Sequence, residues 1–229
     1  MESGLLAHWS FDEGSGNIAN DSISSLALVR IGAVWDPAGV FGGAINLDGV
    51  DDYLEVKSPG ALLDFGTGDF TIAIWIKSRN FGTATAGPQH IVGRGLGDGT
   101  IQKGYRLFFG WNEAKSHNLQ LRIADGEASS ITAQAKSGFY DARAGDWIMV
   151  AGVRDGDELR VYSDGVLYDT WSGAITTNID VEEAFNDTFR VGASPYMAHH
   201  PFDGWLDELR VYTRALNDDE IAALAQLPE

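Results

Sequence analysis

Residues 70–76 read FTIAIWI, and this stretch decides the fold class. Its even-numbered positions are all large and apolar, from Phe70 to Ile76, whereas its odd-numbered positions hold Thr71, Ala73 and Trp75. Side chains alternate between the two faces of a β-strand, so a period of two predicts a strand with one face on a hydrophobic core.

Further short runs rich in β-branched and aromatic residues lie downstream: Tyr105–Phe109, Leu119–Ile123, Trp147–Val153, Leu159–Tyr162, Val166–Trp171, Phe189–Val191 and Trp205–Tyr212. The dipeptide Asp-Gly occurs six times, beginning at positions 48, 98, 125, 155, 164 and 203. Glycine supplies the positive φ that tight hairpin turns require, so each dipeptide is a hairpin signal. Many short strands at close spacing predict an all-β sandwich or barrel.

One short helix is expected at the C-terminal end. Asn217 is followed by three acidic residues, which are favourable in the first turn of a helix, and the apolar run Ile221–Ala225 comes next. Pro228 falls just past this run. The helix is about two turns long, so it caps the fold rather than building it.

Length and composition are typical of one domain rich in strands and turns, covering residues 1–229. The chain has 28 glycines and seven tryptophans but no cysteine, which excludes a disulfide scaffold and thiolate metal sites. The net charge of −17 repels phosphate backbones, so nucleic acid is not an expected partner. No apolar run approaches the roughly 18 residues of a membrane span. Residues 1–3 lack the character of a signal peptide and are interpreted as a leader that replaces one or as a cut at a domain boundary.

Five blocks of the sequence, taken in order, resemble laminin G-like domains of the concanavalin A-like type. They are LAHWSFDEGSG at 6–16 with 20–22, FGGAINLDG at 41–49 with 51–54, FTIAIWI at 70–76, WIMVAGV at 147–153 with the hairpins up to 165, and FDGWLDELRVY at 202–212 with 214–216 and 220–221. No single block is specific, but five in register are. The resemblance implies a two-sheet antiparallel jelly roll, usually an accessory or adhesion module of a larger secreted protein.

A structural calcium site is expected to join the two ends of the chain. In similar domains a calcium ion commonly pins the first loop to an aspartate of the closing strand, and Asp12, Asn20, Asp21 and Asp207 match that pattern, Asp21 and Asp207 best. Calcium prefers hard oxygen ligands of this kind. Asp207 also lies in an apolar strand, where a carboxylate is costly unless paired or metal-bound. In the alternative interpretation Asp207 pairs with amides or an arginine, and Asp12 and Asp21 cap turns.

The sequence gives little support for catalysis. Retaining glycosidases need two carboxylates about 5 Å apart on one surface, and no strand carries the spacing Glu-x-Asp-x-Glu or Glu-x-Asp-x-x-Glu. The lyase spacing Gln-x-His is also missing around His90, which we interpret as a residue between loop and strand. No nucleophile elbow, zinc-protease helix or phosphate loop is present. We therefore expect no enzyme.

Two segments are candidates for ligand binding. The loop residues Tyr196, His199 and His200 combine aromatic and imidazole groups just before the closing strand, and functional groups concentrate on loops. Strand parity places Arg106 on the face opposite Tyr105, Leu107 and Phe109, and Arg106 and Trp111 are then expected to line the concave face. Each has a structural alternative, since Tyr196 can pack on the sandwich edge and a strand tryptophan usually belongs to a core.

The sequence thus predicts a secreted, non-catalytic carbohydrate-binding module with a structural calcium ion, and a glycan or polysaccharide as its partner. A protein-binding adhesion module is the first alternative. A jelly-roll glycoside hydrolase or polysaccharide lyase is the second.

Overall fold

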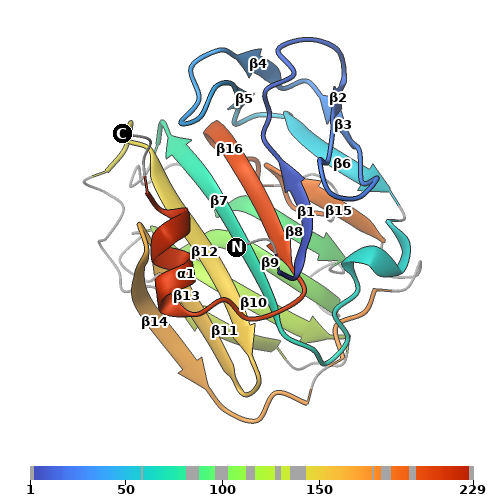
Figure 1. Cartoon of the computed structure of the whole chain (residues 1–229), viewed down its shortest axis with the longest axis vertical. Coiled ribbons are helices and arrows are strands. Elements are labelled where there is room, and N and C mark those ends of the chain that lie inside the picture. The colour runs from blue at the N-terminus through green and yellow to red at the C-terminus, as the bar shows by residue number, and fades with distance from the viewer. Residues whose placement is uncertain are drawn as a thin grey trace.

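The computed structural model describes residues 3–57, 59–80, 88–95, 103–111, 117–126, 130–134, 143–176, 178–181, 187–195 and 200–226, with the backbone alone at 111, 117 and 130–134. The described strands form two antiparallel sheets of eight strands each. Figure 1 looks onto the first sheet, with the second sheet behind it. The predicted all-β sandwich is confirmed.

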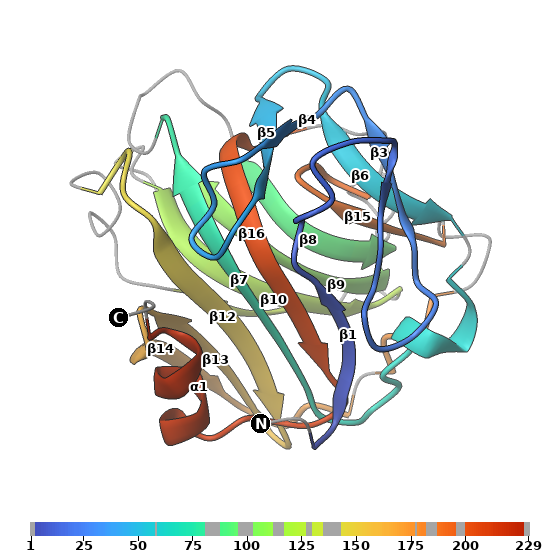
Figure 2. The ribbon, with the colours of Figure 1, turned by 45° about the horizontal axis from the view of Figure 1, so that its top comes forward.

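The first sheet contains the predicted strand FTIAIWI at its centre. Its strand order is β14 (Val166–Ser172), β13 (Glu158–Ser163), β12 (Ile148–Asp155), β7 (Phe70–Ser78), β16 (Asp203–Tyr212), β5 (Ala44–Asp48) and β4 (Val34–Asp36), and β1 (Leu5–Trp9) also pairs with β16. The pairing of β1 with β16 sets Trp9 opposite Leu209, so the first and last strands of the chain lie side by side (Figure 2).

The second sheet has the order β11 (Ser130–Gln134), β10 (His117–Asp125), β9 (Lys103–Trp111), β8 (Gln89–Gly95), β15 (Thr188–Val191), β6 (Tyr53–Lys57), β3 (Leu28–Ile31) and β2 (Ile18–Ala19). A 3₁₀ turn, η1 (Gly60–Leu63), and the helix α1 (Asp218–Leu224) complete the described elements. No helix of the described residues is long and apolar enough to cross a membrane.

Two apolar clusters are present, which corrects the expectation of a single buried face for residues 70–76. The even-numbered side chains, such as Ile72 and Ile74, belong to the main core between the sheets. The odd-numbered Ala73 and Trp75 belong to a second cluster on the outer face of the first sheet, together with Leu216 and residues of α1. Figure 1 shows α1 lying over this face.

The Asp-Gly signals differ in their outcome. Asp155 and Asp164 open the hairpins β12–β13 and β13–β14 as predicted, and positive φ at Asp164 and Gly165 (48° and 78°) is the type I′ pattern. The dipeptide at 203 lies inside β16, where Gly204 is opposite Ser78 on β7 and a Cβ on it would come 2.1 Å from the carbonyl oxygen of Lys77. There glycine serves close strand approach rather than a turn.

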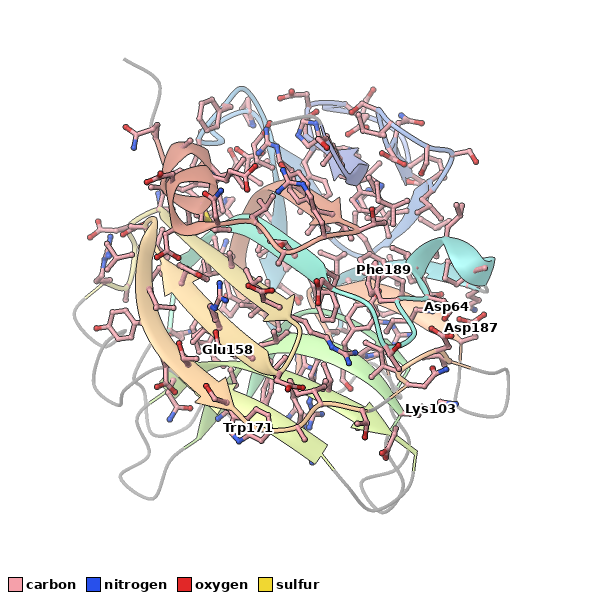
Figure 3. The ribbon with its side chains drawn as sticks, turned by 60° about the horizontal axis from the view of Figure 1, so that its bottom comes forward. Asp64, Lys103, Glu158, Trp171, Asp187 and Phe189 are labelled. Atoms are coloured by element: carbon pink, nitrogen blue, oxygen red, sulfur yellow. The ribbon has the colours of Figure 1, made fainter. Side chains whose placement is uncertain are left out.

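A buried arginine holds the loops at one end of the sandwich. Arg94 is 1% exposed and lies 2.8 Å from Asp64 and 2.7 Å from Asp187. Figure 3 shows these two aspartates close together. A buried charge needs such partners, so we assign this cluster to structure rather than binding.

Candidate functional site

The two predicted ligand segments meet on the outer face of the second sheet. The Arg106 guanidinium lies 4.6 Å from the centre of the Phe108 ring, and both residues lie on β9. The centre of the His90 ring, on the neighbouring strand β8, lies 5.2 Å from the centre of the Phe108 ring. The exposed His200 ring then stacks on His90 at 5.8 Å with an interplanar angle of 13°. Arg106, Phe108, His90 and His200 form one continuous stack, which we call the aromatic row.

Strand register builds this row. Tyr105, Leu107 and Phe109 point into the main core, so Arg106 and Phe108 point outward, as parity predicts. The β8–β9 register sets His90 opposite Phe108, and the β9–β10 register sets Gln120 opposite Phe108.

Gln120 extends the row with amide groups. Its Nε2 donates to Asn118 Oδ1 at 2.7 Å, and a Cβ on Gly110 would lie 2.1 Å from that nitrogen. Glycine at 110 therefore leaves the space in which the Gln120 amide lies.

Burial makes this face unusual for the outside of a sandwich. His90 is 2% exposed, Phe108 7% and Gln120 8%, while Arg106 is partly exposed. Outward residues of an antiparallel sheet ordinarily face water. A few polar groups converging on an apolar surface away from bulk water are typical of ligand sites.

Two members of the aromatic row, Arg106 and His90, differ in charge at neutral pH. Burial, then the charge of Arg106, then His200, hold the pKa of His90 well below its usual value, so its imidazole is neutral at pH 7. Its Nδ1 is buried and has no hydrogen-bond partner. Burial and the nearby Arg122 lower the pKa of Arg106 to about 9. Arg106 is thus a cation at neutral pH beside a neutral imidazole.

Of the predicted ligand residues, Arg106 and His200 are brought together. Tyr196 and His199 lie outside the described residues, and Trp111 is described by its backbone, at the end of β9. Phe108 and His90, the other two members of the row, were not among the predicted ligand residues. Phe108 is two residues from Arg106, so strand parity puts both on one face, but the neighbouring strand that brings His90 to them is not visible in the sequence.

Two of the predicted calcium ligands bind the same glycine-rich loop. Asp207 Oδ2 accepts hydrogen bonds from the amides of Val40 at 2.7 Å and Phe41 at 3.1 Å. Asp12 Oδ1 accepts from the amide of Gly43 at 2.6 Å. The loop at 40–43 thereby links the first loop of the chain to its closing strand.

Asp207 is an incompletely satisfied carboxylate. Its side chain is fully buried, and its second oxygen, Oδ1, has no hydrogen-bond partner. Burial raises the pKa of Asp207 to about 7, despite the amides of Phe41 and Val40, and neighbouring Glu208 adds to the rise. A Cβ on Gly39 would lie 1.9 Å from the Gly43 carbonyl oxygen and 2.7 Å from Asp207 Oδ2, so only glycine fits there.

The other two predicted ligands have local partners. Asp21 accepts from the amides of His8 (2.8 Å), Ile23 (3.0 Å) and Ser24 (2.8 Å), and from the Ser24 hydroxyl. Burial acts to raise the pKa of Asp21, but these bonds outweigh it and hold the pKa below its usual value. Asn20 donates from its amide and side chain to Glu13 Oε1, at 2.7 and 3.3 Å.

An acidic turn lines a separate pocket of about 390 Å³ at the edge of the first sheet. The carboxylates of Asp48, Asp51 and Asp52 lie within 4.8 Å of one another. The pocket is lined by Val34, Asn46, Asp48, Asp52, Arg79 and Asp203. Asp48 Oδ1 accepts from the amides of Val50 and Asp51, which is an ordinary role of an aspartate in a turn.

A family model described as the concanavalin A-like lectin/glucanases superfamily (Laminin_G_3) matches residues 48–222. The chain belongs to this superfamily. The match begins at the end of β5, covers β6 to β16 and most of α1, and leaves out β1 to β4; the predicted family is confirmed. No curated protein matches this chain closely enough to be reported as a relative.

Solved structures share the fold at low identity. The binding domain of Paraclostridial Mosquitocidal Protein 1 has a TM-score of 0.72 at 17% identity, covering 97% of this chain and 52% of that one. Domain 4 of AbnA, an extracellular arabinanase from Geobacillus stearothermophilus solved with arabinotriose, has 0.61 at 20%, covering 97% and 98%. The botulinum neurotoxin DC binding domain, solved with rat synaptotagmin II, has 0.70 at 15%, covering 98% and 52%. The chain spans about half the length of the toxin domains.

Proposed function

We propose that this domain is a non-catalytic carbohydrate-binding module whose site is the outer face of the second sheet. The observation that carries the proposal is the aromatic row, in which the exposed ring of His200 stacks on the buried rings of His90 and Phe108, beside the partly exposed guanidinium of Arg106. A sugar ring has an apolar face that stacks on aromatic rings and hydroxyls that bind polar groups. Gln120 and His90 Nδ1 supply such polar groups within the same row.

The related structures give this proposal context. AbnA domain 4 was solved with arabinotriose, and its structural alignment with this domain covers nearly all of both chains. A toxin domain of the same fold was solved with a protein, synaptotagmin. Binding to a protein therefore remains the alternative function, and the experiment must distinguish it from carbohydrate binding.

Among the described residues near the aromatic row there is no pair of carboxylates placed for glycoside hydrolysis, and this favours binding over catalysis. Among the described outward side chains near the row, the carboxylate is Glu55, which lies 2.7 Å from Arg190 and 3.3 Å from Lys57. Asp48 and Asp52 are close together, but both belong to one turn, and Asp52 Oδ2 accepts from the amide of Asp48. Asp48 accepts from the amides of Val50 and Asp51, so both carboxylates are used within the turn itself, and we assign them to structure rather than to catalysis.

A calcium ion belongs to the same proposal, with Asp207 and Asp12 as its carboxylate ligands. The residues fit such an ion, because Asp207 Oδ1 is buried without a partner and calcium accepts carboxylate and carbonyl oxygens. The carbonyl oxygens of Phe11, just after β1, and of Asp36, at the end of β4, lie beside Gly43 of the 40–43 loop. Bound there, calcium would neutralise buried charge and fasten the first loop to β16.

We propose further that the domain works as part of a larger secreted protein. Extracellular fluid supplies millimolar calcium, which suits a site of moderate affinity. The acidic surface, −17 overall, keeps the domain soluble and away from nucleic acid.

A glycan array with the intact chain, run in calcium and again in chelator, tests the function. We expect binding to a restricted set of oligosaccharides, with chelator weakening it through loss of stability rather than loss of a contact. Binding to no glycan in either condition, with the fold intact by circular dichroism, would contradict the proposal and favour the adhesion alternative.

A further inference from the structure

The pocket of about 390 Å³ lies on the outer face of the first sheet, at the other end of that sheet from α1 (Figure 1). On β5, Asn46 and Asp48 lie opposite Trp205 and Asp203 of β16. Leu47, between the first two, belongs to the main core, so strand parity turns these four side chains outward. The sheet itself therefore positions most of the polar lining of the pocket.

Arg79 is held firmly in one wall of the pocket. Its Nη1 donates to Asp203 Oδ1 and to the Leu47 carbonyl oxygen, both at 2.8 Å, and its Nη2 donates to Asn46 Oδ1 at 2.6 Å. The guanidinium also lies 3.8 Å from the centre of the Trp205 ring. Because these contacts exist before any ligand arrives, a ligand in this pocket loses little free energy to the ordering of side chains.

The lining offers a ligand both donors and acceptors. Within the described part of the chain, Asn46 Nδ2 and Arg79 Nε donate no hydrogen bond. Asp48 uses Oδ1 for two amides of its turn, and Asp52 uses Oδ2 for the Asp48 amide. The second oxygen of each carboxylate accepts no hydrogen bond from the described residues, so two donors and two acceptors remain for a ligand.

Carboxylates outnumber cations around the pocket. Its lining contains Asp48, Asp52 and Asp203 against Arg79, and Arg79 is already paired with Asp203 at 2.8 Å. Burial raises the pKa of Asp52, which is 7% exposed, and the charges of Asp48 and Asp51 add to the rise against the effect of the Asp48 amide. A ligand with a negative group is repelled here, whereas a hydroxyl that donates a hydrogen bond offsets the cost of the buried carboxylate.

We infer that this pocket is a second binding site, separate from the aromatic row, and that it takes one uncharged sugar ring. A sugar hydroxyl donates and accepts at the same time. It can therefore donate to Asp48 or Asp52 while it accepts from Asn46 or Arg79. Val34, which is 58% exposed, adds an apolar wall for the C–H groups of the ring. The volume lies near the lower end of the range of about 300–1,000 Å³ for small-molecule sites, which suits one ring rather than a longer chain.

Amide chemical-shift titration of the intact chain tests the inference. The neutral probes are the methyl glycosides of glucose, galactose, mannose, xylose and arabinose, and the charged probes are the uronic acid counterparts of the first three. Calcium chloride alone is a separate probe. We expect at least one neutral glycoside to shift the amides of Asn46, Asp48 and Asp203, and to bind at least tenfold more tightly than any of the uronic acids.

Two variants test the assigned roles. Asn46→Ala removes a donor and should weaken binding of that glycoside at least fivefold, whereas Gln226→Ala, which removes an exposed amide just after α1, should leave it unchanged. Asp48→Asn keeps an oxygen for the two turn amides but removes the charge. It should bring the neutral glycoside and its uronic acid within threefold of each other, and it provides the test if Asn46→Ala does not fold.

The results separate this site from the proposed function. The inference is overturned if no neutral glycoside shifts the pocket amides, if a uronic acid binds as tightly as the neutral sugars, or if calcium alone shifts the amides of Asp48, Asp51 and Asp52 and no sugar does. Sugars that shift only β8, β9 and β10 would leave the proposed function standing without this site. Sugars that shift only the pocket would leave this site standing without the proposed function.

Discussion

Asp207 combines full burial, an incomplete set of hydrogen bonds and a raised pKa. It lies in β16, fully buried, with one oxygen held by two amides of the 40–43 loop and the other without a partner. Its folded-state pKa of about 7 lies above the usual value of 3.8, so without metal the folded protein holds a proton that the unfolded chain has released. That contribution to stability is complete below about pH 4 and is lost as the pH rises through 7.

Asp207→Asn therefore has two expected effects. In chelator the variant should gain stability over the wild type as the pH rises from 5 to 8, by a few kcal/mol, because each pKa unit corresponds to about 1.4 kcal/mol. It should also lose the rise in melting temperature that calcium gives the wild type. Thermal unfolding at both pH values, with and without calcium, measures both effects.

Asp219→Asn is the matched control, since Asp219 is an exposed acid on α1. It should keep the wild-type response to calcium and pH. A calcium response that survives in Asp207→Asn would place the ion elsewhere.

Phe108→Ala tests the aromatic row one residue at a time. Removing the ring takes away the surface shared by Arg106 and His90, and we expect glycan affinity to fall about tenfold, or ~1.4 kcal/mol. Leu167→Ala on β14, an equally apolar deletion on the first sheet, should leave affinity unchanged. Titration calorimetry on both variants decides, and equal affinities would remove Phe108 from the site.

At the scale of elements, α1 is one reason for proposing a ligand face on the second sheet rather than on the first. Ile221 of α1 and Leu216 pack with Trp75 and Tyr212, so the outer face of the first sheet is partly closed by the chain itself. The helix begins at a capping box in which Asn217 accepts from the Glu220 amide and Glu220 accepts from the Asn217 amide.

Asn217→Ala should separate stability from binding. Loss of an N-cap costs about 0.5–2 kcal/mol, so the midpoint of denaturant unfolding should fall. Glycan affinity should stay the same, because α1 lies on the other sheet from the aromatic row. A fall in affinity in the folded variant would mean that α1 helps to form the site.

The elements also show what the sequence could and could not predict. Parity within a strand is local, so the inward faces of β7 and β9 were predicted correctly. Which strands become neighbours depends on contacts distant in sequence, such as His90 with Phe108, and no local pattern records them. For the same reason the sequence did not indicate that a helix some 140 residues later packs with Trp75, or that the loop at 40–43 joins Asp12 to Asp207.

At the scale of the whole molecule, the two sheets have different outer surfaces. The first is covered by the C-terminal segment and the second carries the row of rings, amides and arginines (Figures 1 and 2). The chain ends meet in the β1–β16 pair, far in sequence from the strands that carry the row. The pairing of the first and last strands and the proposed ligand site therefore lie in different parts of the domain.

Chemical-shift mapping of the intact chain with its tightest oligosaccharide tests the central claim most directly. The account predicts that the largest amide shifts fall on β8, β9 and β10, around His90, Phe108 and Gln120. Shifts confined to α1, or to the acidic pocket around Asp48 and Asp203, would contradict it.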